Sequence, residues 1–348
     1  MGISAGYEID LWGRIRNSVR AEKFRMQASL ADYQTAALSL SAEITLTWYR
    51  LQAALQQLAL AEEQITTNEN IVKLIRARFG SGEIRAVDIL RQTQLLEATR
   101  NQKIFFETNV AVLEHQLAVL LGRSPQQDLE IPIADSITMP ELPPLPETGL
   151  PMDLIRRRPD VQQAYLQLLA ADSDWAAAVR SKYPRLSVDM SGQLRANDFQ
   201  SLLDEWAYNL AGNLLAPLFY GGRLSAEADR TEAVKQQQLS NYGQTVLVAF
   251  REVEDALIRE IKQNQRLEVM EKQLDLAQKT NGQLRNEFLN GLSAYLDVLL
   301  GLDQEQQLKR DYIDEQLARM EIRIALYRAL AGSFETEETR NLAAFGAE

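Results

Sequence analysis

Two stretches of the chain alternate apolar and polar residues with a period of two, and each leads into a helical pattern. In the later stretch, Trp206–Leu218, apolar side chains fall on even positions and asparagines on odd ones. This alternation predicts a strand with one apolar and one partly polar face. Pro217 interrupts strand pairing, Gly221 and Gly222 permit a sharp turn, and the apolar period becomes helical from Arg223. The pattern predicts a strand that feeds directly into a very long helix.

The same transition occurs at the start of the chain, where residues 3–11 alternate and a helical pattern begins after Gly13. Gly13 and Gly222 are 209 residues apart, and the offset recurs further along the chain. Matches in one register across strand, helix and turn indicate an internal duplication. The residues related by 209 positions are Phe79 and Phe288, Gly82 and Gly291, Asp88 and Asp297, and Leu90 and Leu299.

Long helices fill most of the remaining sequence. Residues 15–79 contain no proline or glycine and carry small or apolar residues three and four apart, which predicts a helix roughly 95 Å long at about 1.5 Å per residue. A helix of this length needs partners along its side, as in a coiled coil. Short glycine-containing turns predict antiparallel hairpins. The other helices are expected at 87–121, 160–182, 224–288 and 295–330.

A second strand precedes the Trp206 stretch and completes a β-hairpin. After Pro184, apolar residues occupy even positions and polar residues odd ones. The face expected to be apolar carries Leu186, Val188, Met190, Trp206, Tyr208, Leu210 and Leu214. The face expected to be polar carries Ser187, Asp189, Ser191, Gln193, Asn209 and Asn213.

The alternation has two interpretations. The apolar face packs on helices in a soluble α+β domain, or it contacts lipid while the polar face lines a water-filled lumen. The predicted strands have the ~9–11 residues needed to cross an outer membrane. Lipid tolerates no open sheet edge, so the second interpretation requires several copies of the chain to close a barrel.

Composition narrows the class of protein. The 348 residues carry a formal net charge of −11, which argues against nucleic acid as a partner, and there is no cysteine. We find no transmembrane helix, signal peptide, catalytic pair or metal-ligand cluster. The duplication places counterparts of residues 151–196 before Met1, so we expect a fragment whose leader or anchor lies upstream. The alternative is a duplication that never included those elements.

Four stretches resemble the TolC-like outer membrane efflux proteins, in particular the NodT-type lipoproteins of resistance–nodulation–division pumps. The likeness covers nearly the whole chain in order, and the second and third stretches are the most specific. They are YEIDLWGR at 7–14, GLPMDLIRRRPDV at 149–161, PLFYGGR at 217–223 and GLSAYLDVL at 291–299.

The resemblance implies a homotrimer that shares a twelve-stranded barrel, with four strands from each subunit, in the bacterial outer membrane. It also implies a helical tunnel through the periplasm whose far end meets a periplasmic adaptor and an inner-membrane pump. Gly82, Asp88, Gly291 and Asp297 would form the periplasmic tips. The family's acylated cysteine, first helices and first strand are expected upstream of Met1, and Ser293 stands where some relatives carry an acidic residue.

The expected fold is therefore mainly α with a small β part: long coiled-coil hairpins joined to membrane strands, in two copies. The function expected is a passive exit duct for drugs, metals or other small molecules, with no enzymatic activity and no cofactor besides the upstream lipid anchor. The alternative functions are a periplasmic adaptor and a soluble coiled-coil scaffold.

Asp88 and Asp297 either form charged rings at the tunnel mouth or stabilise helix N-termini. The expected segments are a strand at 1–14, a hairpin at 15–122, a belt at 123–158, a helix at 159–183, a β-hairpin at 184–222, a second helical hairpin at 223–332 and a tail at 333–348.

Overall fold

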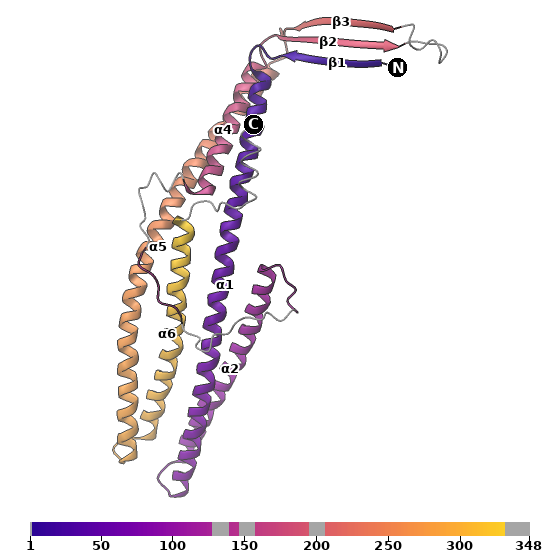
Figure 1. Ribbon diagram of the computed structural model, residues 1–348. Helices are drawn as coiled ribbons and strands as arrows, with labels where there is room; N and C mark the ends of the chain where they lie inside the picture. The colour runs from indigo at the N-terminus through magenta and orange to yellow at the C-terminus, as the bar shows by residue number, and fades with distance from the viewer. Residues whose placement is uncertain (1, 127–138, 146–156, 195–205, 331–348) are drawn as a thin grey trace. The chain divides into compact units, whose positions relative to one another are not determined.

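The computed structural model describes residues 2–126, 139–145, 157–194 and 206–330 (Figure 1). Most of the predicted belt, the loop between the paired strands and the tail lie outside these residues. The fold is mainly helical with one small antiparallel sheet, as the alternating and helical patterns predict. Its elements are β1 (Gly2–Ile9), α1 (Arg14–Gly80), α2 (Ala86–Leu120), α4 (Pro159–Arg180), β2 (Arg185–Leu194), β3 (Trp206–Leu215), α5 (Arg223–Leu289) and α6 (Tyr295–Leu330).

The described residues fall into two compact units. The strand unit lies within Met1–Ala36 and Leu150–Phe250, and the hairpin unit within Ala37–Gly149 and Arg251–Ala331. Each unit is built on its own stretches of α1 and α5. No helix within the described ranges combines the length and the apolar character needed to cross a bilayer.

The sheet of the strand unit has the order β1-β2-β3, with both pairs antiparallel. Its register aligns Ala5 with Met190 and Leu210 in one row, and Ser4 with Ser191 and Asn209 in the next. Directly opposed residues project from the same face, and successive residues project from opposite faces. The register therefore gathers the predicted apolar set on one face and the predicted polar set on the other.

The turn from β1 into α1 is closed by Asp10. Its carboxylate accepts hydrogen bonds from the backbone amides of Ile15 (3.1 Å) and Arg16 (2.8 Å), which have no partner within the first helical turn. Arg14 donates to both carboxylate oxygens of Glu8 at 2.8 Å. The strand and the helix are thus joined by polar contacts local to the turn.

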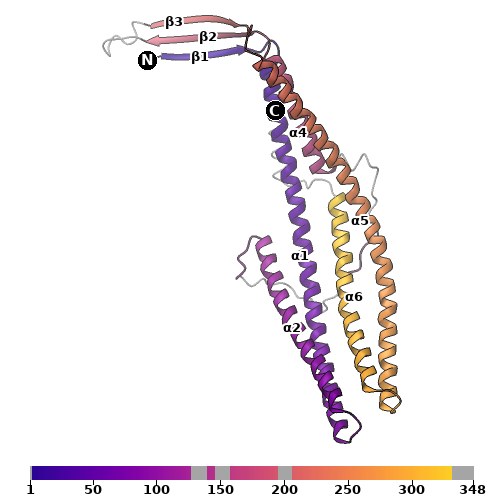
Figure 2. The same ribbon diagram turned by 180° about the vertical axis from the view of Figure 1, so that it is seen from behind.

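In the hairpin unit, α2 lies along α1 and α6 along α5 in both views (Figures 1 and 2). The two turns end their first helices in the same way. Gly82 and Gly291 adopt φ values of +82° and +75°, and the amides of Glu83 and Leu292 reach back five residues to Arg78 and Glu287. This Schellman closure explains why the duplication retains a glycine at both turns.

One apolar cluster joins the two hairpins, and a second joins the two helices of the first hairpin. Near the turns, Ile75 of α1 and Ile84 pack with Tyr295 and Leu299 of α6. Farther along, Leu51 and Ala54 of α1 pack with Leu113 and Leu117 of α2. Burial of these side chains supplies the main driving force for helix association in this unit.

Buried amides run between the apolar clusters. Gln57 donates to the backbone oxygen of Arg310 at 2.8 Å, and Gln64 donates to that of Gln306 at 3.1 Å. Asn68 donates to Thr99 of α2 at 3.1 Å. The predicted small and apolar seam of α1 is therefore interrupted by polar contacts that fix the register of neighbouring helices.

A buried ion pair links α5 to α6. Arg323 donates from Nε to both carboxylate oxygens of Glu260, at 3.1 and 2.9 Å, and its Nη1 donates to the Pro143 carbonyl at 2.6 Å. Glu260 is 1% exposed and Arg323 is 4% exposed. The hydrogen bonds from Arg323 to Glu260 raise the pKa of the guanidinium, so it stays charged. One side chain thus joins two helices and the described part of the predicted belt.

Candidate functional site

The apolar face of the sheet is uncovered by the rest of the described chain. Tyr208, Leu210 and Leu214 are 70%, 67% and 72% exposed, and Leu186 and Val188 of the middle strand are half-buried. Trp206 pairs with Leu194 through the backbone, but its side chain lies outside the described part of the structure. A contiguous apolar surface of this kind marks a site of contact with a partner or a membrane.

The opposite face of the sheet is polar and also open. Asp189 and Asn213 lie on neighbouring strands, and the Asn213 amide donates to the Asp189 carboxylate at 2.5 Å. A Cβ added to Gly6 would lie 2.7 Å from Oδ1 of Asp189, so the carboxylate occupies the space that a side chain at residue 6 would fill. Ser187, Ser191, Gln193 and Asn209 share this face.

The predicted tip aspartates occupy equivalent positions with different surroundings. Each is the third residue of its helix, where a carboxylate stabilises the positive end. Asp88 is 3% exposed and forms ion pairs with Arg85 (3.1 Å) and Arg91 (3.7 Å). Asp297 is exposed. The two carboxylates therefore differ in their access to solvent.

Tyr295 connects the two turns. Its hydroxyl donates to Oε1 of Gln92 on α2 at 2.6 Å, within the apolar cluster that Ile75 and Leu299 also line. Burial, and then the nearby Asp88 carboxylate, raises the pKa of the Tyr295 phenol. The phenol therefore remains protonated, and the hydrogen bond that ties the first hairpin to the second persists at neutral pH.

Two apolar stripes of the hairpin unit face away from its core. On α2, Phe105, Val112 and Val119 are spaced by seven residues and are each more than half exposed. On α5, Ile258, Val269 and Leu276 are spaced by eleven and seven residues and are equally exposed. Spacings of seven and eleven keep side chains on one side of a helix, as in coiled-coil interfaces.

A groove of about 310 Å³ lies near the turns of the hairpin unit, between α1, α5 and α6. Its apolar lining includes Ile75, Phe288 and Val298, and its charged lining includes Arg285 and Lys309, the latter paired with Glu305 at 3.1 Å. A lining with both apolar and charged residues suits an amphipathic helix of another protein.

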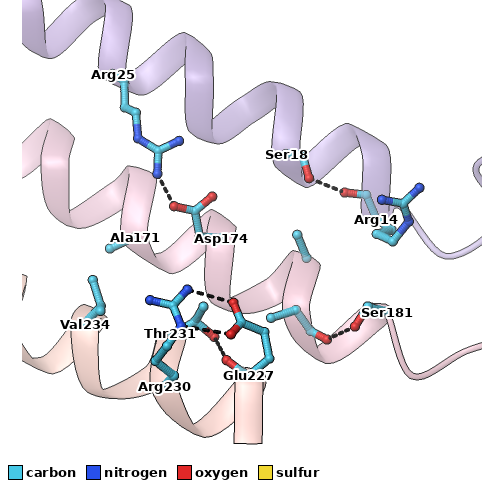
Figure 3. Close-up of a pocket in the computed structure, with 12 residues that line it drawn as sticks. Arg14, Ser18, Arg25, Ala171, Asp174, Ser181, Glu227, Arg230, Thr231 and Val234 are labelled. Carbon is cyan, nitrogen blue, oxygen red and sulfur yellow. Dashed lines mark hydrogen bonds and ion pairs between the residues drawn. The ribbon is translucent and has the colours of Figure 1, made fainter. Parts of the chain in front are cut away.

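A larger cleft of about 500 Å³ lies in the strand unit among α1, α4 and α5 (Figure 3). Arg25 of α1 points toward Asp174 of α4, and Arg230 bonds Glu227 one turn away on α5 at 2.7 Å. Arg14, the third arginine of the cleft, pairs with Glu8. Each of these guanidinium groups has a carboxylate partner, so the cleft offers no uncompensated charge to an anion.

The alternation predicts the two faces of the sheet and the glycines predict the two turns, but the sequence did not reveal several side-chain contacts. The register brings Asp189, Asn213 and Gly6 together, and Gln92 meets Tyr295 across 203 residues. The exposed stripe at Phe105, Val112 and Val119 carried a detectable signal, a strict seven-residue period. No pattern in the sequence indicated that Glu260 pairs with Arg323.

Known proteins resemble this chain over almost all of its length. The outer membrane efflux protein family matches residues 1–123 and 150–332. The pyoverdine export outer membrane protein OpmQ of Pseudomonas aeruginosa is 30% identical over 338 residues, covering 97% of this chain and 70% of OpmQ. The cation efflux system protein CusC of Escherichia coli is 27% identical over 342 residues, covering 96% of this chain and 72% of CusC.

A solved structure agrees with these sequence matches. A membrane protein of Pseudomonas aeruginosa superposes with a TM-score of 0.90 at 26% identity, covering 97% of this chain and 76% of that protein. The matches are to outer membrane channels and support neither an adaptor nor a soluble scaffold. The chain belongs to the outer membrane efflux protein family and is an outer membrane channel component of a tripartite efflux pump.

Proposed function

We propose that copies of this chain assemble as a homotrimer in which the sheets close into one barrel, with lipid outside and a water-filled lumen inside. The observation that carries the proposal is the uncovered sheet with one apolar and one polar face. In the order β1-β2-β3, the outer edges of β1 and β3 have no partner strand within the described sheet. Unpaired edges are costly in lipid, and strands donated by neighbouring copies would satisfy them.

The proposal extends to the helices. The exposed stripe on α2 differs from that on α5, so packing the α2 stripe of one copy on the α5 stripe of the next makes a head-to-tail contact. Such contacts close into a ring when the rotation between copies allows it. The helices would then continue the lumen as a tunnel through the periplasm.

The hairpin turns, by the same proposal, meet a periplasmic adaptor. The groove lined by Ile75, Phe288 and Val298 offers an apolar surface beside the turns, and Arg285 and Lys309 also line it. An amphipathic hairpin helix of the adaptor would place apolar side chains on this surface. The inner-membrane pump of the assembly would supply the energy for transport.

Transport through the duct is proposed to be passive and to involve no chemical step. OpmQ is named for pyoverdine export and CusC for cation efflux, and both match the same stretch of this chain at similar identity. We infer that the choice of exported compound resides mainly in the partner pump. Cargo of different sizes and charges could then share one duct.

The α2 stripe provides a test of the assembly. Replacing Phe105 and Val112 by Glu places two carboxylates in the proposed subunit contact, and we expect the trimer to dissociate in mild detergent. Each buried unpaired charge opposes association by several kcal/mol. Light scattering coupled to size-exclusion chromatography would report the molar mass.

The matched control is Ala111→Glu, because Ala111 is exposed on the same helix but lies off the stripe. We expect this variant to keep the mass of the parent. A double variant that stays trimeric, or an Ala111→Glu variant that dissociates equally, would exclude the proposed contact.

A further inference from the structure

Basic residues gather where the sheet meets the helices. The junction consists of residues 8–16, 180–185 and 216–223, and it carries six cations and only Glu8 and Asp10 as acids, in a chain of net charge −11. Glu8 pairs with Arg14 and Asp10 with Arg16. Arg180, Lys182 and Arg185 form no ion pair with a carboxylate among the described residues, whereas the charge of Arg223 acts on the Glu227 carboxylate one turn along α5.

The junction lies at one end of the sheet. Ile9 pairs with Leu186, and the neighbouring Arg185 pairs with Leu215, so the helix-side ends of all three strands coincide. From this end α1 and α5 begin, and α4 arrives at it. If the apolar face of the sheet lies in lipid, the junction lies at the level of the headgroups.

Arg180 and Arg16 converge at this level. Arg180 donates from Nη1 to the Gly13 carbonyl at 3.4 Å. Nη1 of Arg180 and Nη2 of Arg16 each lie 3.5 Å from the position that a Cβ on Gly13 would take. Two guanidinium groups therefore share one small region in which Asp10 is the ion-paired carboxylate, and Lys182 lies exposed two residues from Arg180.

Half-exposed aromatic rings flank these cations. Trp12 stacks on Tyr183 with ring centroids 5.2 Å apart, and its Nε1 donates to the Pro184 carbonyl at 2.8 Å. The two side chains are 49% and 47% exposed. Rings with one polar atom satisfied and an open apolar edge are enriched where a membrane meets water.

We propose that the junction binds the phosphate of an anionic phospholipid in the leaflet nearest the helices, with Arg180 and Lys182 as principal contacts. The inference rests on the proposed membrane position of the sheet. A basic side chain near an anionic lipid surface strengthens binding by about 1 kcal/mol, or roughly fivefold for each cation. Together, Arg180 and Lys182 are expected to contribute roughly 25-fold to lipid retention.

The test uses the trimer in nanodiscs of phosphatidylethanolamine with or without phosphatidylglycerol. Native mass spectrometry counts retained lipids, and the thermal unfolding midpoint is measured in parallel. The parent is expected to retain phosphatidylglycerol selectively and to unfold at a higher temperature in its presence. Arg180→Gln/Lys182→Gln should lose most of both effects, whereas Lys262→Gln/Lys272→Gln, which removes equal charge from exposed positions on α5, should lose neither.

Three outcomes would overturn this inference: a parent without headgroup preference, a double variant that keeps the preference, or equal stabilisation by inorganic phosphate in nanodiscs of phosphatidylethanolamine. The last outcome would indicate a site for free anions. Insertion of the parent into phosphatidylethanolamine nanodiscs is scored separately. Failure to insert would contradict the proposed membrane function, whereas insertion without headgroup preference would contradict the lipid site alone.

Discussion

Replacing Glu260 by Gln is expected to destabilise the hairpin unit by about 3–5 kcal/mol, the range for removal of one partner of a buried ion pair. Glu260 is 1% exposed and accepts charge-assisted hydrogen bonds from Arg323 on both oxygens. The variant leaves a guanidinium buried without a counter-charge. Chemical unfolding of the purified protein, followed by helical circular dichroism, would measure the loss.

Two variants sharpen this prediction. Asp275→Asn breaks an exposed ion pair with Lys279 on the same helix, and it should change stability by less than about 1 kcal/mol. Glu260→Leu/Arg323→Met removes both charges and should recover much of the loss, because paired apolar replacements are often tolerated. A Glu260→Gln variant as stable as Asp275→Asn would show that the buried pair does not hold the helices.

Glu260→Gln should also weaken the contact between Arg323 and the segment at Pro143. Arg323 Nη1 donates to the Pro143 carbonyl at 2.6 Å, and its position depends on Glu260. Hydrogen exchange within residues 139–145 is therefore expected to accelerate in Glu260→Gln and to stay unchanged in Asp275→Asn. Equal exchange rates in both variants would show that the ion pair does not hold this segment in place.

An arginine on the apolar face of the sheet is also expected to destabilise the protein strongly in a membrane. Leu210→Arg should reduce the free energy of unfolding by about 2–4 kcal/mol, the range for a cation near the middle of the lipid face of a membrane strand. Leu210 lies mid-strand, aligned with Met190 and Ala5, and is 67% exposed. The free energy of folding would be measured for the parent and the variant by refolding each from urea into lipid vesicles.

Asn209→Arg is the matched control, because the neighbouring residue on β3 projects from the polar face. In a water-filled lumen its arginine remains hydrated, and the expected change is within about 0.5 kcal/mol. Equal costs for Leu210→Arg and Asn209→Arg would contradict the assignment of lipid and water to opposite faces.

Much of the fold follows from periodicity. A period of two, broken by Pro217, predicts the apolar row of β3, and the observed register aligns it with the apolar residues of β2. The glycines at 82 and 291 predict the turns, because only glycine adopts the observed positive φ at low cost. These features depend on local conformation and on the difference between apolar and polar residues, which sequence displays directly.

Contacts between distant polar residues were not predictable. Glu260 and Arg323 lie 63 residues apart among many other charges, and helical period alone does not identify which charge is buried. Gln57 and Gln64 bond to backbone oxygens, which every residue carries, so no partner type marks them. A buried polar side chain of this kind is recognisable only once the helices are packed.

The surroundings of the tip aspartates were partly predictable from the sequence. Asp88 and Asp297 are related by the duplication, yet Asp88 is buried between Arg85 and Arg91. The counterparts of these arginines, 209 residues later, are Ala294 and Leu300. The comparison of repeats therefore contained the information that Asp297 lacks both cations, although the shared aspartate alone suggested equal roles.

In the proposed assembly, one face of the sheet contacts lipid and the other contacts water. The chain has no cysteine, so single cysteines introduced at residues 207–214 of β3 would each be unique. In intact outer membranes, a membrane-impermeant maleimide is expected to label cysteines at Asn209, Ala211 and Asn213 and to spare those at Tyr208, Leu210 and Leu214. Uniform labelling of both sets, or labelling of the apolar set alone, would contradict the claim.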